Sequence, residues 1–563
     1  MTGTKPHTAS LLAQWLIALA LVPLLVLMGC DSGSNGDDIE ASDQTPEASF
    51  TTSFNEFTVS FDASGSTDPD GGEISSYAWE FGDGATASGT QVSHTYDMAG
   101  DYDVTLTVVD DEGTDATATE TVTVDPDQIT VRNDITSNTT WSGSKTYILD
   151  GLIFVDPGAT LTIEPGTVVK GLQSSNITTG DGASALIVRR GASIDADGAS
   201  DNPIVFTSEL DDVTDPNDLT SEDRELWGGV ILLGDAPTNE PTQNTQIEGI
   251  PDSENALYGG DNPQHDIGTF RYVSIRHGGF SISGVEGDEI NGLTMGGVGN
   301  QSTIEYVEIF ANFDDGFEWF GGTVHTKYLV AAFCGDDGFD YDQGFQGTGQ
   351  YWFVVQNDDT AGRAGEHDGG DTDETGTPFA LPIVANATYI GSGANNTNID
   401  DEAIIFRDNA GAEYYNSIFT DFPTHGPTVE DLSSGGDSRQ QLEDGNLVLD
   451  NNVWSGFGDG NDAASIIPQD FVRTAIGGDQ ILQDPELGGI SRTNDGGLDP
   501  RPGADFGTNT PTASADFDNA AGRTADLTTI FDDVSYYGAF DPSASSLWTD
   551  GWTALSTEGY TAN

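Results

Sequence analysis

A pair of adjacent aspartates recurs at a fixed interval in the middle of this chain. Asp-Asp occurs at 314–315, 336–337 and 358–359, so that successive pairs are 22 residues apart. The same shift aligns Tyr306 with Tyr328, Val307 with Leu329 and Tyr351, Ile309 with Ala331 and Phe353, Phe317 with Phe339, Trp319 with Tyr341, and Gly322 with Gly344. A period of this length is typical of a solenoid, in which each repeat packs only on its neighbours. A β-propeller blade would need about twice as many residues.

Short apolar segments continue this pattern from Gln128 onward. They are separated by Gly, Asn and Asp and show almost no helical periodicity, as in "ATLTIEPGTVVKG" and "ALIVRRGASIDADG". We therefore predict an all-β chain in which residues 128–540 form a right-handed parallel β-helix. We expect "VEGDEINGLTMGGVGNQS" to be an inserted loop that projects from a coil. The closing segment, including residues 541–563, is expected to cap the last coil, because an open end would expose unpaired strand edges.

A second β unit precedes the solenoid. Residues 46–125 contain "FDASGSTDPDGG", "YAWEFGDG", "SHTY" and "AGDYDVTLTVVDDEG", where period-two strands are broken by Gly, Pro and Asp. These motifs resemble the PKD domain. The resemblance implies a β-sandwich that acts as a spacer or as a carbohydrate- or protein-contacting module. Trp79 and Phe81 are expected in its core, and Gly82 and Gly84 in a tight turn between strands.

The N-terminus predicts export and a lipid anchor. A weakly basic start is followed by an apolar run from Leu11 to Met28 and then by Gly29 and Cys30. The stretch "LMGC" resembles a bacterial lipobox, which implies that residues 1–29 are a signal peptide and that lipidated Cys30 anchors the protein in a membrane. Residues 30–45 would then be a flexible tether. We expect a lipid-anchored protein of the cell envelope, placed on the outer membrane and facing outward. The sequence itself does not determine which membrane or which leaflet holds the anchor.

The charge of the chain excludes some partners. The sequence contains 17 Lys and Arg against 94 Asp and Glu, a formal net charge of −77. Nucleic acids and anionic membrane surfaces would repel such a protein. Because 36% of the residues are hydrophobic, we expect a folded chain with an acidic surface. Such a surface indicates a halophilic protein. Near 1 M salt the Debye length falls to about 3 Å, so repulsion between the surface carboxylates is largely screened.

The aspartate pairs are candidate metal ligands. Coils of a β-helix are about 4.8 Å apart, so equivalent aspartates would repel by about 3–4 kcal/mol at an effective dielectric near 20. Two interpretations stay open. The pairs bind Ca²⁺, or they form solvated turns in which Asp bonds its own backbone and Gly takes positive φ. The candidate ligands are Asp314, Asp315, Asp336, Asp337, Asp358 and Asp359, with Glu318, Asp340 and Asp342 nearby, and Asp68 and Asp70 as a second site.

Aromatic residues crowd the same coils. Most of the rings are expected in the core. Trp319, Tyr341 and Trp352 are candidates for outward faces that stack on sugar rings.

Catalysis by the same face is an open alternative. The loop "AGRAGEHDGGDTDE" places Arg363, Glu366 and His367 one turn beyond the ladder, with His367 as a candidate general base or an ordinary loop residue. Hydrolases of polysaccharides need two carboxylates roughly 5–10 Å apart, and an acidic ladder provides that spacing. The sequence contains no nucleophile elbow, phosphate loop, HExxH or CxxC motif.

Longer motifs add a resemblance for the solenoid. "IEPGTVVKG", "WGGVILLGDAPTN", "DDGFEWFGGTVHTKYLV" and "YYGAFDPSASSLWTDGWTALS" resemble a family of secreted bacterial proteins with a pectin-lyase-like β-helix, often lipoproteins, without an established activity. We expect a lipid-anchored surface protein with a binding or structural role, whose ligand is a polysaccharide or a surface protein and whose coils are stabilised by Ca²⁺. The alternative is a polysaccharide lyase or hydrolase that acts at the face around residues 314–367.

Overall fold

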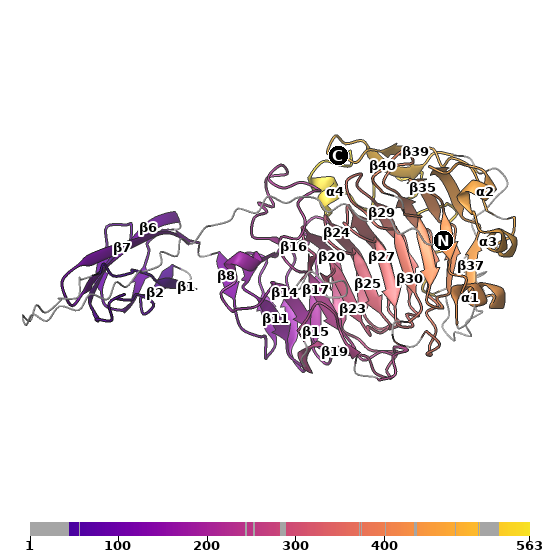
Figure 1. Cartoon of the computed structure of the whole chain (residues 1–563). Helices are drawn as coiled ribbons and strands as arrows, with labels where there is room; N and C mark the ends of the chain where they lie inside the picture. Colours follow the sequence, from indigo (N-terminus) through magenta and orange to yellow (C-terminus); the bar gives the residue numbers. More distant parts are fainter. Residues whose placement is uncertain are drawn as a thin grey trace, which may run out of the picture.

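The computed structural model describes residues 44–562 except for 56, 99, 126, 243–244, 252–253, 282–288, 371, 373, 400, 433–435, 479, 505 and 507–528. The predicted signal peptide, Cys30 and nearly all of the predicted tether lie outside these residues. Among the described residues, no helix has the length and apolar character needed to cross a membrane. The described chain forms two β units, a small sandwich and a long solenoid (Figure 1).

The sandwich consists of two antiparallel sheets. The three-stranded sheet has the order β1-β2-β5, with β1 (Thr51–Asn55), β2 (Thr58–Asp62) and β5 (Gln91–Thr95). The four-stranded sheet has the order β4-β3-β6-β7, with β3 (Ile74–Glu80), β4 (Thr86–Ser88), β6 (Gly100–Asp110) and β7 (Asp115–Val124).

Aromatic residues form the sandwich core as predicted. Trp79 and Phe81 are buried, and the Trp79 indole nitrogen donates a hydrogen bond to the Gly89 carbonyl oxygen at 2.9 Å. Gly82 and Gly84 have φ angles of 82° and 92°, which confirms that the turn needs left-handed residues.

Parallel pairing between successive coils builds the solenoid. One face is a nine-stranded parallel sheet of β11 (Leu152–Val155), β14 (Ala185–Val188), β17 (Val230–Leu233), β23 (Leu293–Gly296), β25 (Phe317–Phe320), β27 (Phe339–Asp342), β30 (Gly365–Asp368), β33 (Ile404–Arg407) and β36 (Pro427–Val429). The parallel pairing confirms the predicted β-helix and rules out the antiparallel blades of a propeller.

The other two faces join into one eighteen-stranded sheet. Its strands are β8 (Gln128–Val131), β9 (Thr139–Trp141), β10 (Thr146–Leu149), β12 (Thr160–Ile163), β13 (Val168–Gly171), β15 (Ser193–Asp197), β16 (Ile204–Ser208), β20 (Gly268–Arg276), β24 (Thr303–Phe310), β26 (His325–Ala332), β28 (Thr348–Gln350), β29 (Phe353–Val355), β31 (Ile383–Ala385), β32 (Thr388–Ile390), β34 (Ala412–Tyr415), β35 (Ile418–Phe422), β37 (Leu447–Asp450) and β38 (Val453–Phe457). Inward side chains of all three faces form one continuous apolar core.

The eighteen-stranded sheet bends at a corner that residues with positive φ occupy. β20, β24 and β26 pass through Tyr272, Tyr306 and Tyr328, with φ angles of 48°, 54° and 57°. Their rings stack at centroid distances of 4.4 and 4.2 Å. In later coils Asn386 and Asn416 hold the same corner. Asparagine adopts left-handed backbone more readily than most residues, and ring stacking offsets part of the backbone cost at the tyrosines.

The predicted period holds for the central coils. β25 pairs with β27 so that Phe317 lies opposite Phe339 and Trp319 opposite Tyr341, an offset of 22 residues. β24 and β26 keep the same offset.

The period then lengthens. Val330 lies opposite Phe353, an offset of 23, and Asp340 lies opposite Glu366, an offset of 26. The predicted alignments of Tyr351 with Leu329 and of Phe353 with Ala331 are therefore wrong by one residue.

The region predicted as a projecting loop contains a core strand. β23 lies within it, and Leu293 and Met295 are fully buried. Smaller elements between the strands of the two large sheets include the hairpins β18 (Thr245–Gln246) with β19 (Leu257–Tyr258) and β21 (Phe280–Ser281) with β22 (Glu289–Ile290), and the 3-10 helices at Ser174–Asn176 and Glu254–Ala256.

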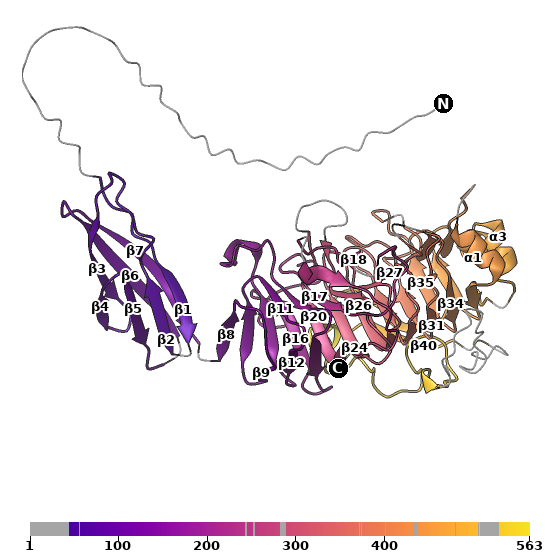
Figure 2. The ribbon, with the colours of Figure 1, turned by 90° about the horizontal axis from the view of Figure 1, so that it is seen from below.

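Helices lie at the last coils, and the closing segment packs on the side of these coils, where Phe531 shares an apolar cluster with Val448 of β37 and Tyr537 shares one with Val453 of β38. α1 (Ser438–Asp444) contacts β37 and α2 (Ala463–Ile466) contacts β38, with α3 (Asp470–Ala475) beside them (Figures 1 and 2).

The C-terminal segment (residues 529–562) runs back along the outside of the solenoid (Figure 1). It contains α4 (Ala554–Thr557) and follows the hairpin of β39 (Leu487–Ile490) and β40 (Leu498–Pro502). Its apolar side chains pack on outer residues of β24, β26 and β29, including Phe310 and Phe353. The prediction of a cap on the last coil is therefore wrong.

Candidate functional site

Acidic side chains form a row on the outer face of the nine-stranded sheet. Side chains alternate along a strand, so Phe317 and Trp319 of β25 enter the core while Glu318 lies on the opposite face. The residues in register with Glu318 are Asp340 in β27 and then Glu366 in β30. The repeat therefore places one acidic residue from each of three coils side by side.

A cavity of about 270 Å³ lies over this row, and we call it the acidic cleft. Its lining residues are Glu248, Glu289, Asn291, Asp314, Asp315, Glu318, Asp336, Asp337, Asp340, Arg363, Glu366 and Arg407. A groove of about 470 Å³ adjoins the cleft, shares Glu248, Glu318 and Asp340 with it, and continues to Asp368 and Thr372.

Two groups of carboxylates in the cleft approach closely enough to share a cation. The carboxylate oxygens of Asp315, Glu318 and Asp340 lie within 4.8 Å of one another, and so do those of Asp314, Asp315 and Asp336. Asp315 belongs to both groups. Hard cations such as Ca²⁺ prefer oxygen ligands of this kind, so the donor set fits such an ion.

Burial makes these carboxyl groups hard to ionise. Burial, and next the charge of Asp336, raise the pKa of Asp314 to about 8. Burial also raises the pKa of Asp315, Glu318 and Asp340 well above the ordinary range, and neighbouring carboxylates add to the effect. A cation among these groups would favour their ionised forms.

Asn291 contributes a buried oxygen to the cleft. Its side-chain nitrogen donates hydrogen bonds to Glu248 at 3.1 Å and to Glu318, which turns the amide toward the carboxylates. The residue is 1% exposed, and among the described residues its side-chain oxygen finds no hydrogen-bond partner. A buried carbonyl oxygen without a donor is costly, and a bound cation would satisfy it.

The second aspartate of each pair also connects neighbouring coils. Asp315 accepts a hydrogen bond from the Asp337 backbone nitrogen at 2.9 Å, and Asp337 accepts one from the Arg363 backbone nitrogen. The predicted turn geometry is wrong for Asp315 and Asp337, because these two side chains bond the backbone of the next coil. Gly316 and Gly338 do not have positive φ; a Cβ there would lie 2.7 and 2.8 Å from neighbouring atoms.

Arginines enter the site where the acidic row ends. Arg363 forms ion pairs with Glu366 at 2.6 Å and with Glu402 at 3.1 Å. Arg407 pairs with Asp368 at 2.7 Å and with Glu366. Glu366 is therefore held between two guanidinium groups, and the predicted grouping of Arg363 and Glu366 is present.

His367 is not a surface base. Its side chain is fully buried, and its ring stacks on Tyr341 at 4.3 Å. The Nδ1 atom lies 2.6 Å from the Glu366 carbonyl oxygen, so it carries the proton, and Nε2 accepts a hydrogen bond from the Tyr414 hydroxyl at 2.7 Å. Burial lowers the pKa of His367 to about 3. Both interpretations of His367, general base and exposed loop residue, are corrected to a core residue.

The three aromatic residues predicted to meet sugar rings are also core residues. Trp319, Tyr341 and Trp352 are fully buried, and the two indole rings stack at 5.0 Å. Period-two alternation places Trp319 and Tyr341 on the inner side of β25 and β27, opposite the acidic row, and Trp352 immediately precedes β29.

The third aspartate pair does not continue the ladder. The residues opposite Asp336 and Asp337 are Gly362 and Arg363, because the intervening coil is four residues longer than its predecessor. Asp358 is exposed, and Asp359 forms an ion pair with Arg224 at 2.9 Å. The prediction of Asp358 and Asp359 as ladder ligands is therefore wrong.

The sandwich carries a smaller acidic group. Carboxylate oxygens of Asp68, Asp111 and Glu112 lie within 4.8 Å of one another at its surface. Asp70, the other predicted ligand, instead accepts a hydrogen bond from the Gln44 backbone nitrogen at 3.0 Å.

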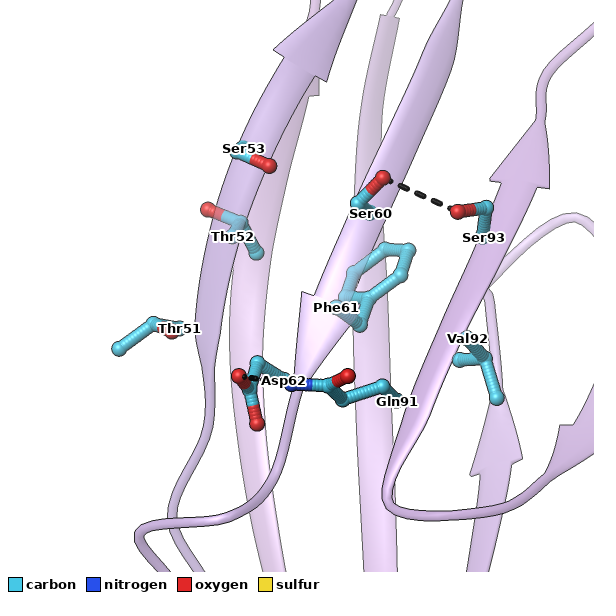
Figure 3. Close-up of a pocket in the computed structure, with 9 residues that line it drawn as sticks. All are labelled: Thr51, Thr52, Ser53, Ser60, Phe61, Asp62, Gln91, Val92 and Ser93. Atoms are coloured by element: carbon cyan, nitrogen blue, oxygen red, sulfur yellow. Dashed lines mark hydrogen bonds between the residues drawn. The ribbon is translucent and has the colours of Figure 1, made fainter.

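The three-stranded sheet of the sandwich presents a shallow polar cavity of about 510 Å³ (Figure 3). Ser60 and Ser93 hydrogen-bond to each other at 3.0 Å, and the Gln91 amide donates to Asp62 at 2.6 Å. These polar groups satisfy one another, so this surface shows no convergent set of groups for a ligand.

Sequence reasoning missed Glu248, Glu289 and Asn291. A signal for Asn291 was present, because "NGLTMGG" parallels "DGFEWFGG" and Leu293 lies opposite Phe317. Asn291 is thus the equivalent of Asp315 in the preceding coil. No comparable repeat marks the two glutamates.

Comparisons with known proteins match both β units. Residues 133–459 match the model of the pectate-lyase like beta helix domain, and residues 43–124 match that of the PKD domain. A microbial collagenase of Vibrio alginolyticus is 47% identical over 66 residues, which is 12% of this chain and 8% of that protein. Collagenase ColQ1 of Bacillus cereus is 42% identical over 72 residues, 13% of this chain and 7% of that protein. This chain therefore covers less than a tenth of either collagenase.

Two solved structures are also similar to parts of this chain. The PKD1 domain of Vibrio anguillarum Epp is 42% identical, with 15% of this chain and 98% of that one covered and a TM-score of 0.14. A family 28 exopolygalacturonase of Yersinia enterocolitica is 11% identical, with 74% of this chain and 80% of that one covered and a TM-score of 0.20. Because the β-helix model matches more than half of the sequence, the chain belongs to the family of proteins with a pectate-lyase-like β-helix domain.

Proposed function

We propose that this protein is an envelope-anchored binding protein that holds Ca²⁺ in its acidic cleft and a glycan in the adjoining groove. Lipidation of Cys30 would attach the chain to the membrane, and the PKD domain would act as a spacer that holds the solenoid away from it. The acidic surface suits a saline exterior, where repulsion between like charges is screened.

One observation carries the proposal. Asp315, Glu318 and Asp340 bring carboxylate oxygens within 4.8 Å of one another beside the unpaired, buried oxygen of Asn291. Without a cation, such desolvated carboxylates must repel or stay protonated. Ca²⁺ accepts about six to eight oxygen ligands in flexible geometry, which suits a site built from three coils better than the strict octahedron of Mg²⁺.

The groove supplies what a polyhydroxylated ligand needs. Its volume of about 470 Å³ is in the range of small-ligand sites, and Gln246, Gln343 and Thr372 offer amide and hydroxyl groups beside the carboxylates. Ca²⁺ at the shared wall of cleft and groove would reduce the negative potential that otherwise repels an acidic glycan.

Calorimetry with Ca²⁺ tests the proposal directly. We would titrate the chain from Asp31 onward at fixed high NaCl, beside Asp340→Asn and the matched control Asp358→Asn. Asp340 has a side-chain oxygen without a hydrogen-bond partner among the described residues, whereas Asp358 is exposed outside the cleft. We expect micromolar binding in the wild type and the control, and at least tenfold weaker binding in Asp340→Asn. Absence of heat together with an unchanged Tm in Ca²⁺ would contradict the proposal.

A second candidate function is hydrolysis of a polysaccharide. Asp340 and Glu366 lie opposite each other on neighbouring strands, which puts their carboxyl groups roughly 5 Å apart, near the spacing of retaining glycosidases. Burial raises the pKa of Asp340, as a general acid needs, while Glu366 forms ion pairs with Arg363 and Arg407. Reducing ends released from polysaccharides by the wild type but not by Glu366→Gln would support this alternative.

A further inference from the structure

The two carboxylate groups of the acidic cleft differ in their surroundings. The inner group, Asp315 with Glu318 and Asp340, lies beside Asn291, and Glu318 is 7% exposed. The outer group adds Asp314, which is half-buried, and Asp336, which is exposed. The outer group therefore opens to solvent while the inner group lies beneath it, and Asp315 connects them.

A single divalent cation leaves most of the charge in the cleft unbalanced. The lining contains nine carboxylates and two guanidinium groups, so ionised side chains would exceed cationic ones by seven charges. One Ca²⁺ balances two of these charges. Arg363 and Arg407 both lie on the Glu366 side of the row, where they pair with Glu366. Neither one forms an ion pair with Asp314, Asp315 or Asp336 among the described contacts.

The buried amide of Asn291 indicates a ligand independently of the acidic residues. Asn291 occupies the ladder position of Asp315 in the preceding coil, where a carboxylate would add another negative charge. The amide instead presents a neutral oxygen without a partner among the described residues, while its nitrogen is used by Glu248 and Glu318. A buried neutral oxygen that has no donor, on a residue that lines the acidic cleft, suits a cation ligand.

The backbone leaves Asp315 able to bridge two cations. One of its oxygens, Oδ1, accepts the hydrogen bond from the Asp337 backbone nitrogen. Each carboxylate oxygen has two lone pairs, so Oδ1 keeps one and Oδ2 keeps both for cations. The bond to the next coil also fixes the orientation of the carboxylate before any ion arrives.

We propose that the acidic cleft binds a pair of divalent cations, one in the inner and one in the outer group, with Asp315 as the shared ligand. This inference rests on the proposed Ca²⁺ binding and adds its stoichiometry and the bridging residue. The inner cation takes Asn291, Glu318 and Asp340 as further ligands, and the outer cation takes Asp314 and Asp336.

Counting the bound ions separates the two proposals. We would remove metal from the chain with EGTA, dialyse it against Ca²⁺ at fixed high NaCl, and measure bound metal per chain. We expect two ions in the cleft of the wild type, one in Asp336→Asn and one in Asp340→Asn. The PKD acidic group is removed from the count by Asp68→Asn in every variant. One ion in the wild type overturns the pair and leaves the proposed function intact, and no ion overturns both.

Manganese tests whether the two ions share a ligand. With two Mn²⁺ bound, we expect an electron paramagnetic resonance spectrum broadened by coupling between the ions, and a sharp single-ion spectrum in Asp336→Asn. Asp315→Asn keeps an oxygen acceptor for the Asp337 backbone nitrogen, so the fold should persist while the coupling and at least one ion are lost. Two uncoupled ions, or an unchanged spectrum in Asp315→Asn, would overturn the bridging role.

Discussion

A single residue, Asp315, both connects two neighbouring coils and contributes to the carboxylate groups of the acidic cleft. Asp315 holds the next coil through the Asp337 backbone nitrogen and also lies in both carboxylate groups. Glu308 is an acidic residue with a purely structural position, since its buried carboxylate accepts hydrogen bonds from Ser274 at 2.6 Å and from the Ala554 backbone nitrogen at 2.6 Å. An acidic composition alone therefore does not separate ligands from structural groups.

Glu558 should make stability depend on pH. Burial raises its pKa to about 8, although Arg276 at 3.5 Å opposes the shift. A carboxyl group whose pKa is raised by folding binds more protons when folded, so its contribution is present at pH 4 and is lost as pH rises to about 8. We expect the Tm of the wild type to fall between pH 5 and pH 8 more steeply than that of Glu558→Gln. Parallel curves for the two proteins would contradict this assignment.

At the scale of elements, two features lie outside the core: the corner of the eighteen-stranded sheet, where the tyrosine rings stack, and the C-terminal segment, which packs on the outer side of that sheet. The tyrosine corner needs left-handed backbone at Tyr306, which β-branched residues avoid. Tyr306→Asn and Tyr306→Val both remove the stacked ring, but Val should cost about 1 kcal/mol more because of its backbone. We expect Tyr306→Val to melt below Tyr306→Asn in calorimetric scans. Equal melting temperatures would mean that ring stacking alone sets the cost.

The C-terminal segment should detach locally when its buried anchor is removed. Glu308 accepts hydrogen bonds from the first backbone nitrogens of α4, so Glu308→Ala leaves those donors unpaired. We expect at least tenfold faster proteolysis within residues 529–562 in Glu308→Ala, with the solenoid itself intact on gels. Glu308→Gln keeps acceptor oxygens and is the matched control. Equal cleavage of all three proteins would show that apolar packing alone holds the segment.

For the whole molecule, we expect the net negative charge to make the stability of the fold depend on salt. With a net charge of −77, unscreened repulsion destabilises the compact state. We expect the Tm to rise by several degrees between 0.1 M and 1 M NaCl. Tetramethylammonium chloride at equal ionic strength should reproduce the rise if screening is the cause. A Tm that stays constant in NaCl would contradict a halophilic surface.

The sequence by itself determined the coil and the alternation of its faces. The 22-residue period, Phe317 with Phe339 and the acidic row of Glu318 and Asp340 follow from hydrogen-bond register and period-two alternation, which are local properties. Alternation alone does not show which face of a strand is the inner one, so the sequence wrongly predicted an outward side chain for Trp319, which is buried in the core.

Only the tertiary structure decided which side chains meet. A four-residue insertion replaced the third aspartate pair by Gly362 and Arg363, and residues as distant as Glu248 and Asn291 completed the cleft. The path of the C-terminal segment could not be predicted from the sequence either, because that path depends on the apolar outer surface of β24 and β29. Loop lengths and long-range packing set these contacts, and neither one follows from a local repeat.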